Sequence, residues 1–189
     1  QLPVAVAAKF PHQMSGGQLQ RAMIGMAVAC EPAVLIADEP TTALDVTVQA
    51  RIMHLLRELT GDGMGLLLIT HDLALVSQSA ERVYVMYAGR VVESGPTADV
   101  FLRPAHPYTA GLLNTQPVLG RGRARLATIE GRVPAADAEV AGCRFRDLCS
   151  SANQRCTQLA PQLAIAPERV DGHNAECHYP VKPPRLEVT

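Results

Sequence analysis

Two adjacent carboxylates follow a short apolar run and give the first indication of chemistry. The run is Val34–Ala37, and Asp38 and Glu39 come directly after it, before Pro40. Because the run is short and bounded by prolines, it predicts a buried strand. Strands buried on both faces occur in parallel sheets covered by helices, and chemistry gathers at their carboxyl ends. Two acids there suit a magnesium nucleotide, since one can hold the metal while the other orients or deprotonates a water. Taken alone, the pair fits a strand end with two solvated acids equally well.

A second apolar run, residues 65–70, ends in His71 and Asp72. If the two runs are neighbouring parallel strands, His71 meets the acids at the same sheet edge. An imidazole there can donate to a γ-phosphate oxygen and so sense whether that phosphate is present, although a lone histidine is more often structural. We expect Asp72 to cap a helix that runs through Ser79.

A helix start precedes both runs. Ser15 is a good N-cap with Gln18 three residues later, and Gly16 and Gly17 lie between them. Exposed backbone N–H groups at such a start can bind an anion with help from the helix dipole; an ordinary capped helix is the alternative. The helix has a predicted apolar face, which also places Cys30 in the core: Leu19, Ala22, Met23, Met26, Ala27 and Cys30.

The segment 41–45 starts another helix, in which Asp45 can serve as a partner for the N-terminal dipole. Its predicted buried stripe is Leu44, Val48, Ile52, Leu55, Leu56 and Leu59. Further on, residues 82–87 and 90–93 flank Ala88-Gly89, which predicts a hairpin, and a short helix through Phe101 follows. No chemistry is visible in the hairpin.

These motifs, in this order, resemble the second half of an ABC ATPase domain over about residues 10–100. The expected fold is therefore α/β: the second half of a P-loop NTPase domain (ABC-type, RecA-like) with a parallel sheet and flanking helices. The resemblance implies ATP and Mg²⁺ as cofactors. It makes Glu39 the general base, Asp38 the magnesium ligand and His71 a γ-phosphate contact.

The same resemblance gives the helix start a role across a subunit interface. Ser15, Gly16, Gly17 and Gln18 would contact the nucleotide held by a second ATPase subunit, and Asp45 would belong to the loop that contacts that subunit. The partner would be identical or paralogous.

Composition changes after Gln116, and we place a domain boundary near 105. Residues 1–105 form the ATPase part and residues 106–189 an extension. The runs His106–Leu113 and Thr128–Pro134 resemble the carboxyl-terminal extension of dipeptide and oligopeptide importer ATPases. Nickel importers are close relatives, and the sequence does not separate peptide, nickel and glutathione as substrates.

Four of the five cysteines lie in this extension, and five, six and twenty residues separate them: Cys143, Cys149, Cys156 and Cys177. Disulfides are unusual in cytosolic proteins, whereas four thiolates suit zinc or an iron–sulfur cluster. The gaps are wider than those of common zinc sites. In the resembled family such a pattern holds a 4Fe–4S cluster; four buried, reduced thiols are the alternative. His173 and His178 are nearby ligand alternatives.

Charge and composition exclude some classes of function. A net charge of −1 gives no basis for nucleic-acid binding, and the absence of Trp argues against a base-stacking platform. No apolar run reaches the roughly 20 residues that span a bilayer, and Gln1-Leu-Pro-Val does not resemble a signal peptide.

A P-loop is missing from these 189 residues. We therefore expect the chain to be the carboxyl-terminal part of a longer subunit, which alone binds ATP feebly and hydrolyses none. The resemblance implies the ATPase subunit of a peptide importer on the cytoplasmic face of the inner membrane, peripheral through two permease subunits, with a peptide-binding protein as an indirect partner. The alternatives are a soluble ABC ATPase acting on ribosomes or DNA, and a non-catalytic fragment with a metal-stabilised interaction module.

Overall fold

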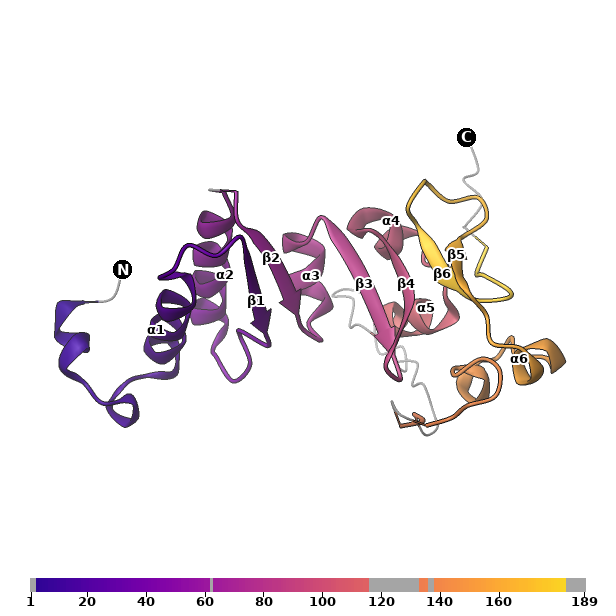
Figure 1. Ribbon diagram of the computed structural model, residues 1–189, viewed down its shortest axis with the longest axis horizontal. Helices are drawn as coiled ribbons and strands as arrows, with labels where there is room; N and C mark the ends of the chain where they lie inside the picture. The colour runs from indigo at the N-terminus through magenta and orange to yellow at the C-terminus, as the bar shows by residue number, and fades with distance from the viewer. Residues whose placement is uncertain (1–2, 62, 116–132, 136–137, 183–189) are drawn as a thin grey trace, which may run out of the picture. The chain divides into compact units, whose positions relative to one another are not determined.

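A computed structural model describes residues 3–61, 63–115, 133–135 and 138–182 (Figure 1). The chain divides into two compact units, Gln1–Ser79 and Ala80–Thr189. Residues 128–132 of the predicted Thr128–Pro134 motif lie outside the described residues. Every helix in the described ranges is too short or too polar to span a membrane.

The first unit alternates helices and strands. Its elements are η1 (Val4–Ala8), η2 (Pro11–Gln13), α1 (Gly16–Val28), β1 (Val34–Asp38), α2 (Val46–Gly61), β2 (Gly65–Ile69) and α3 (Leu73–Ser79). Strands β1 and β2 pair in parallel, from Val34 opposite Gly65 to Asp38 opposite Ile69. The predicted parallel pairing is confirmed, and it puts the ends of both strands at one edge.

One face of this sheet carries the core of the unit. The buried members of the core are Ile24, Leu35, Ala37, Ile52, Met53 and Leu56. The predicted stripe of α2 is confirmed, with Met53 as an addition. The opposite sheet face is open, because Val34, Ile36, Leu67 and Ile69 are 45–64% exposed. The prediction that β1 is buried on both faces is therefore not met by the residues that the structure describes.

Helix α1 begins at the predicted cap but turns a different face to the core. Ser15 and Gln18 form the capping box, as predicted. Ile24 is the buried residue of the helix, whereas Cys30 is exposed, so the predicted apolar face and core position of Cys30 are wrong. The reason is the contact of the glycines with α2: a Cβ atom on Gly17 would lie 2.5 Å from Val48 Cγ1. This close approach points the Gly17–Ile24 side of α1 toward α2.

The second unit is an antiparallel sheet with short helices and irregular segments. Its elements are β3 (Arg82–Tyr87), β4 (Arg90–Pro96), α4 (Thr97–Leu102), α5 (Pro107–Asn114), η3 (Arg146–Leu148), α6 (Gln154–Gln158), β5 (Leu163–Ile165) and β6 (Asn174–Glu176). The strand order is β3-β4-β6-β5. The predicted hairpin is confirmed, with positive φ at Ala88 (47°) and Gly89 (78°), as a two-residue hairpin turn requires.

The extension completes the sheet that the hairpin begins. Strand β6 pairs with β4 through Glu93 opposite Ala175, and Phe145 packs on Tyr87 and Tyr108 at ring-centroid distances of 5.2 and 5.6 Å. The compact units therefore divide after Ser79, whereas the boundary predicted near 105 marks a change of composition and motif inside the second unit.

Leu56→Ala should lower the free energy of unfolding by about 2–5 kcal/mol, because it leaves a cavity at a fully buried position. Met26→Ala on α1, where the side chain is 70% exposed, should change it by no more than about 0.5 kcal/mol. Urea unfolding monitored by circular dichroism measures both. Equal effects of the two substitutions would contradict the position of the core.

Candidate functional site

The carboxylate of Glu39 and the imidazole of His71 meet at the shared edge of β1 and β2. Glu39 Oε1 lies 2.7 Å from His71 Nδ1 and accepts the backbone N–H of His71 at 3.2 Å. Its other oxygen, Oε2, accepts the Thr42 hydroxyl at 2.8 Å. The convergence of the two strand ends, expected from their sequence positions, is thus present in the structure.

Backbone geometry holds Glu39 at this edge. Its N–H donates to the carbonyl of Ile69 at 2.9 Å, and its φ of 47° lies in the left-handed region that few non-glycine residues adopt. The bond continues the parallel ladder by one residue, and the positive φ then turns the chain. Such outliers are often found at functional sites.

The contact shifts both titrations in favour of the charged forms. The hydrogen bond from His71, followed by that from Thr42, lowers the pKa of Glu39. The hydrogen bond to Glu39 raises the pKa of His71. Both groups are open to solvent, and the His71 side chain is 83% exposed, so the pair is accessible to a ligand.

The remaining predicted nucleotide residues lie at nearby chain turns. Asp38 is exposed at the end of β1. Asp45 Oδ1 accepts the N–H of Val48 at 2.9 Å and so caps α2, which agrees with the dipole-partner interpretation. Asp72 accepts the N–H of Leu75 at 3.1 Å, so the predicted cap of α3 is confirmed.

The side chains of Ser15 and Gln18 form hydrogen bonds within their own segment. Ser15 Oγ accepts the N–H of Gln18 at 3.4 Å, and Gln18 Oε1 accepts the N–H of Ser15 at 3.1 Å. A Cβ atom on Gly16 would lie 3.2 Å from Leu44, so the segment lies beside the chain that precedes Asp45. Its glycines have a packing role that the sequence pattern did not reveal.

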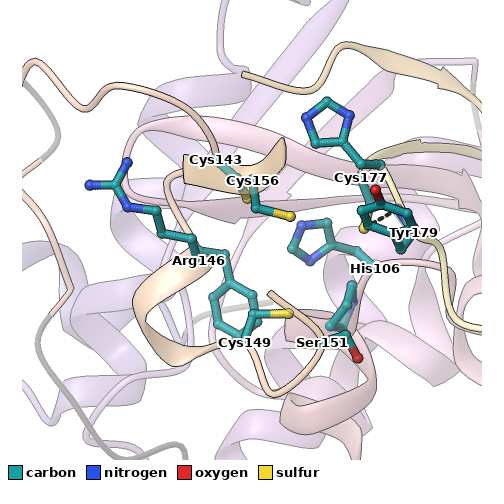
Figure 2. Close-up of a pocket in the computed structure, with 11 residues that line it drawn as sticks. His106, Cys143, Arg146, Cys149, Ser151, Cys156, Cys177 and Tyr179 are labelled. Carbon is teal, nitrogen blue, oxygen red and sulfur yellow. Dashed lines mark hydrogen bonds between the residues drawn. The ribbon is translucent and has the colours of Figure 1, made fainter. Parts of the chain in front are cut away.

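In the second unit the four cysteines of the extension line one cavity (Figure 2). The central space measures about 10 Å³, about the room for the centre of one water-sized sphere. All four thiols are free rather than in disulfides. Cysteines from residues 143 to 177 of the chain are thus brought to one place.

Local backbone contacts fix where the thiols lie. The N–H of Cys143 donates to the carbonyl of Cys156 at 2.7 Å. Gly142 precedes this contact with φ at 75°, and a Cβ atom there would lie 2.3 Å from the same carbonyl oxygen, so only glycine fits. Cys177 Sγ accepts the N–H of Tyr179 at 3.4 Å.

Burial keeps Cys143, Cys149 and Cys177 in the thiol form at neutral pH. It raises the pKa of Cys177 to about 11, and it also raises the pKa of Cys143 and of Cys149. The neighbouring cysteines add to each rise, since a second negative charge in the cavity would repel the first. A bound cation would reverse this effect and favour thiolates.

Four thiols are a donor set that fits a soft metal group, but they are not arranged as a ready site for a single ion. Zinc with four thiolates requires sulfur atoms about 3.8 Å apart, from Zn–S bonds of about 2.3 Å. Among the described residues, no three Cys, His, Asp or Glu side chains form a group that could hold one ion. A cluster with one cysteine per iron spreads its ligands more widely.

The two histidine alternatives separate in the structure. His178 lines the cavity, with Nε2 at 2.8 Å from the carbonyl of Leu159. His173 has no exposed surface, and its Nε2 lies 2.7 Å from Glu93 Oε1. Glu93 is the residue that the sequence pattern missed, since strand β4 showed no chemistry. The available signal was a carboxylate beside Val91 and Val92 in a strand.

Two family models match the chain. Residues 3–42 match the ABC transporter family, and residues 92–156 match the family described as "Oligopeptide/dipeptide transporter, C-terminal region". The chain is therefore similar to ABC transporter ATP-binding proteins in its first part and to the oligopeptide/dipeptide transporter C-terminal region in its second part.

Curated relatives agree with both matches. The dipeptide transport ATP-binding protein DppD of Haemophilus influenzae is 50% identical over 91% of this chain and 51% of that protein. DppD of Escherichia coli is 49% identical over 91% of this chain and 52% of that protein. The chain thus spans about half the length of these relatives. A solved dimeric ATP-binding cassette with ADP and Pi is 35% identical, with a TM-score of 0.46 over 51% of this chain and 41% of that one.

Glu39→Gln should lower the pKa of His71 toward its ordinary value of 6.5, because the carboxylate partner is lost. In the wild type, the charged pair stabilises the folded state. The contribution of Glu39 to this stability is lost as pH falls through its lowered pKa, and the contribution of His71 is lost as pH rises through its raised pKa. Both groups are thus charged over a window that extends below 4.5 and above 6.5. NMR titration of the His71 ring measures the shift. An unchanged His71 titration in the variant would contradict the pairing.

Proposed function

We propose that the chain is part of an ATP-hydrolysing subunit of an ABC importer for dipeptides or oligopeptides, and that it carries the catalytic residues at the edge of the parallel sheet. The observation that carries the proposal is the 2.7 Å contact of Glu39 with His71 at the carboxyl ends of two parallel strands. The similarity to peptide-importer relatives over nine-tenths of the chain supports the substrate class.

Glu39, Asp38 and His71 have different roles at this edge of the sheet. Glu39, whose pKa is lowered by its neighbours, is a carboxylate at neutral pH and so can accept a proton from the attacking water. Asp38 holds Mg²⁺, directly or through water. His71 donates to the γ-phosphate and keeps Glu39 in place through its N–H and its ring.

The first turn of α1 serves the nucleotide of a second ATPase subunit. The cap occupies the backbone N–H groups of Ser15 and Gln18, so the N–H groups of Gly16 and Gly17 are the ones that would meet the phosphate. Asp45 and the chain before it lie beside this segment, which suits a shared subunit contact. Two permease subunits would hold the complex at the cytoplasmic face of the inner membrane, with a peptide-binding protein delivering substrate.

The four cysteines hold an iron–sulfur cluster of the 4Fe–4S type, with zinc as the weaker candidate. Four free thiols on one cavity provide the ligands, and four cysteine thiolates are the usual ligand set of a 4Fe–4S cluster. When bound, the group would cross-link the segments that carry the four cysteines. Its place is structural, in the unit that does not contain Glu39.

Supplying a P-loop-bearing amino-terminal half should restore ATP hydrolysis that the chain alone lacks. Glu39→Gln in the restored protein should lower kcat about 10²–10⁴-fold, because the general base is removed. Phosphate release by the purified pair measures the rate.

Glu58→Gln provides a matched control, because Glu58 is an exposed carboxylate on α2 whose partner is His54 at 3.5 Å. It should leave kcat within about twofold. Wild-type activity in Glu39→Gln would exclude Glu39 as the base. Restored ATPase without co-purifying permeases would leave catalysis in place but remove support for transport.

Anaerobic purification should yield about four iron and four sulfide per chain, as expected for one cysteine-held cluster. Cys143→Ser should lose the bound metal, whereas Cys30→Ser, at the exposed cysteine of the first unit, should retain it. Metal analysis with visible absorption checks both. One zinc per chain would replace the cluster assignment, and no metal in protein kept anaerobic would refute the centre.

A further inference from the structure

We propose that His106 is a positioning residue for the four-cysteine cavity, beyond its place at the start of α5. The inference rests on the proposed metal centre for its functional meaning, but the contacts that carry it involve only residues of the chain. His106 lines the same cavity as the cysteines, and Figure 2 shows its ring between Cys156 and Cys177. It is 1% exposed, so its ring is part of the wall rather than of the surface.

The ring has two nitrogen atoms with two separate partners. Nδ1 accepts the N–H of Tyr108 at 3.0 Å, which caps α5 (Pro107–Asn114). A neutral imidazole that accepts at Nδ1 carries its proton on Nε2. The backbone of Glu176 acts on the ring in the direction of a raised pKa, as a carbonyl facing Nε2–H does, since Nε2 carries the proton. Burial lowers the pKa of His106 to about 4, so this neutral tautomer persists at neutral pH.

These contacts reach the cysteines from two sides. Glu176 is the last residue of β6 and directly precedes Cys177, and both His106 and Cys177 line the cavity, so the backbone of Glu176 connects the ring to that thiol. On the other side, the His106 ring packs on Phe145 with a centroid distance of 5.5 Å. Phe145 lies in the turn between Cys143 and Cys149, and both cysteines pack against the cluster to which Phe145 belongs.

The backbone of His106 is held as firmly as its ring. Its N–H donates to Glu93 Oε2 at 2.8 Å, and the N–H of Ala105 donates to Oε1 at 2.7 Å. Glu93 has no exposed surface, and β4 places it from within the sheet. An aligned ligand shell usually depends on such supporting contacts, and here they run from β4 through His106 to the cysteine segments.

Two substitutions in the full chain separate the cap from the positioning role. His106→Asn keeps an acceptor near Nδ1 and so keeps the cap, but loses the donor at Nε2. His106→Gln can place an amide N–H near Nε2 but loses the cap. We expect the Asn variant to lose metal to a chelator about 10–100-fold faster than wild type, and the Gln variant to retain most of the wild-type lifetime. His54→Asn, at an exposed histidine of α2, is the matched control and should behave as wild type.

Thiol labelling provides a readout that needs no metal. In reduced, metal-free protein, Cys177 should react with a disulfide reagent at least several-fold faster in the Asn variant than in wild type or the Gln variant. Faster labelling in Asn with no metal in the wild type would keep the positioning role and refute the metal centre. Wild-type metal lifetime and labelling in the Asn variant would overturn the inference, as would a loss in Gln that exceeds the loss in Asn.

A third variant keeps the test decisive if both His106 variants lose the circular dichroism of the wild type. Phe145→Leu removes the ring that His106 contacts but leaves the hydrogen bonds of His106 intact. Faster labelling of Cys149 and shorter metal retention in this variant would support the inference. Unchanged labelling and retention would overturn it.

Discussion

A carboxyl group without exposed surface is costly unless its oxygens have hydrogen-bond partners, and Glu93 has three. They come from the start of α5 and from His173, at 2.7–2.8 Å. Through these hydrogen bonds, one side chain in β4 connects the hairpin, the start of α5 and the segment before β6. Without this carboxylate, three backbone or ring donors in two segments would be buried with no acceptor, so the arrangement of the second unit depends on it.

The first unit depends on a different constraint, the register of two parallel strands. Because Asp38 lies opposite Ile69, the residues that follow the two strands emerge at the same edge, and Glu39 and His71 meet there. A shift of one residue would turn every side chain to the other face of the sheet and separate the pair. The chemistry of the site is therefore set by strand register, with the positive φ of Glu39 completing the turn.

How far the sequence predicted this structure differs between its parts. Strands β1 to β4, with the hairpin, the cap at Ser15 and the stripe of α2, follow from periodicity and turn chemistry, which are local. The buried face of α1 did not follow, because close packing of Gly17 on Val48 decided it and a glycine leaves no mark in an apolar pattern. The role of Glu93 also escaped prediction. Its donors lie 12, 13 and 80 residues away in the chain, and no local pattern encodes such a distance.

The cysteines also show what a local sequence pattern cannot predict. Their residue type predicted a shared site, but their spacing gave no geometry, since the gaps of five, six and twenty residues exceed those of compact metal motifs. The fold brings them together in two ways. At Gly142 the backbone conformation and the close packing permit only glycine, and His106 adds contacts of its own. His106, the first residue of the His-Pro-Tyr motif, thus supports cysteines that begin 37 positions later in the chain, at Cys143. Because such support acts through hydrogen bonds and ring packing, its loss should appear first in the cysteines rather than in the helix that His106 caps.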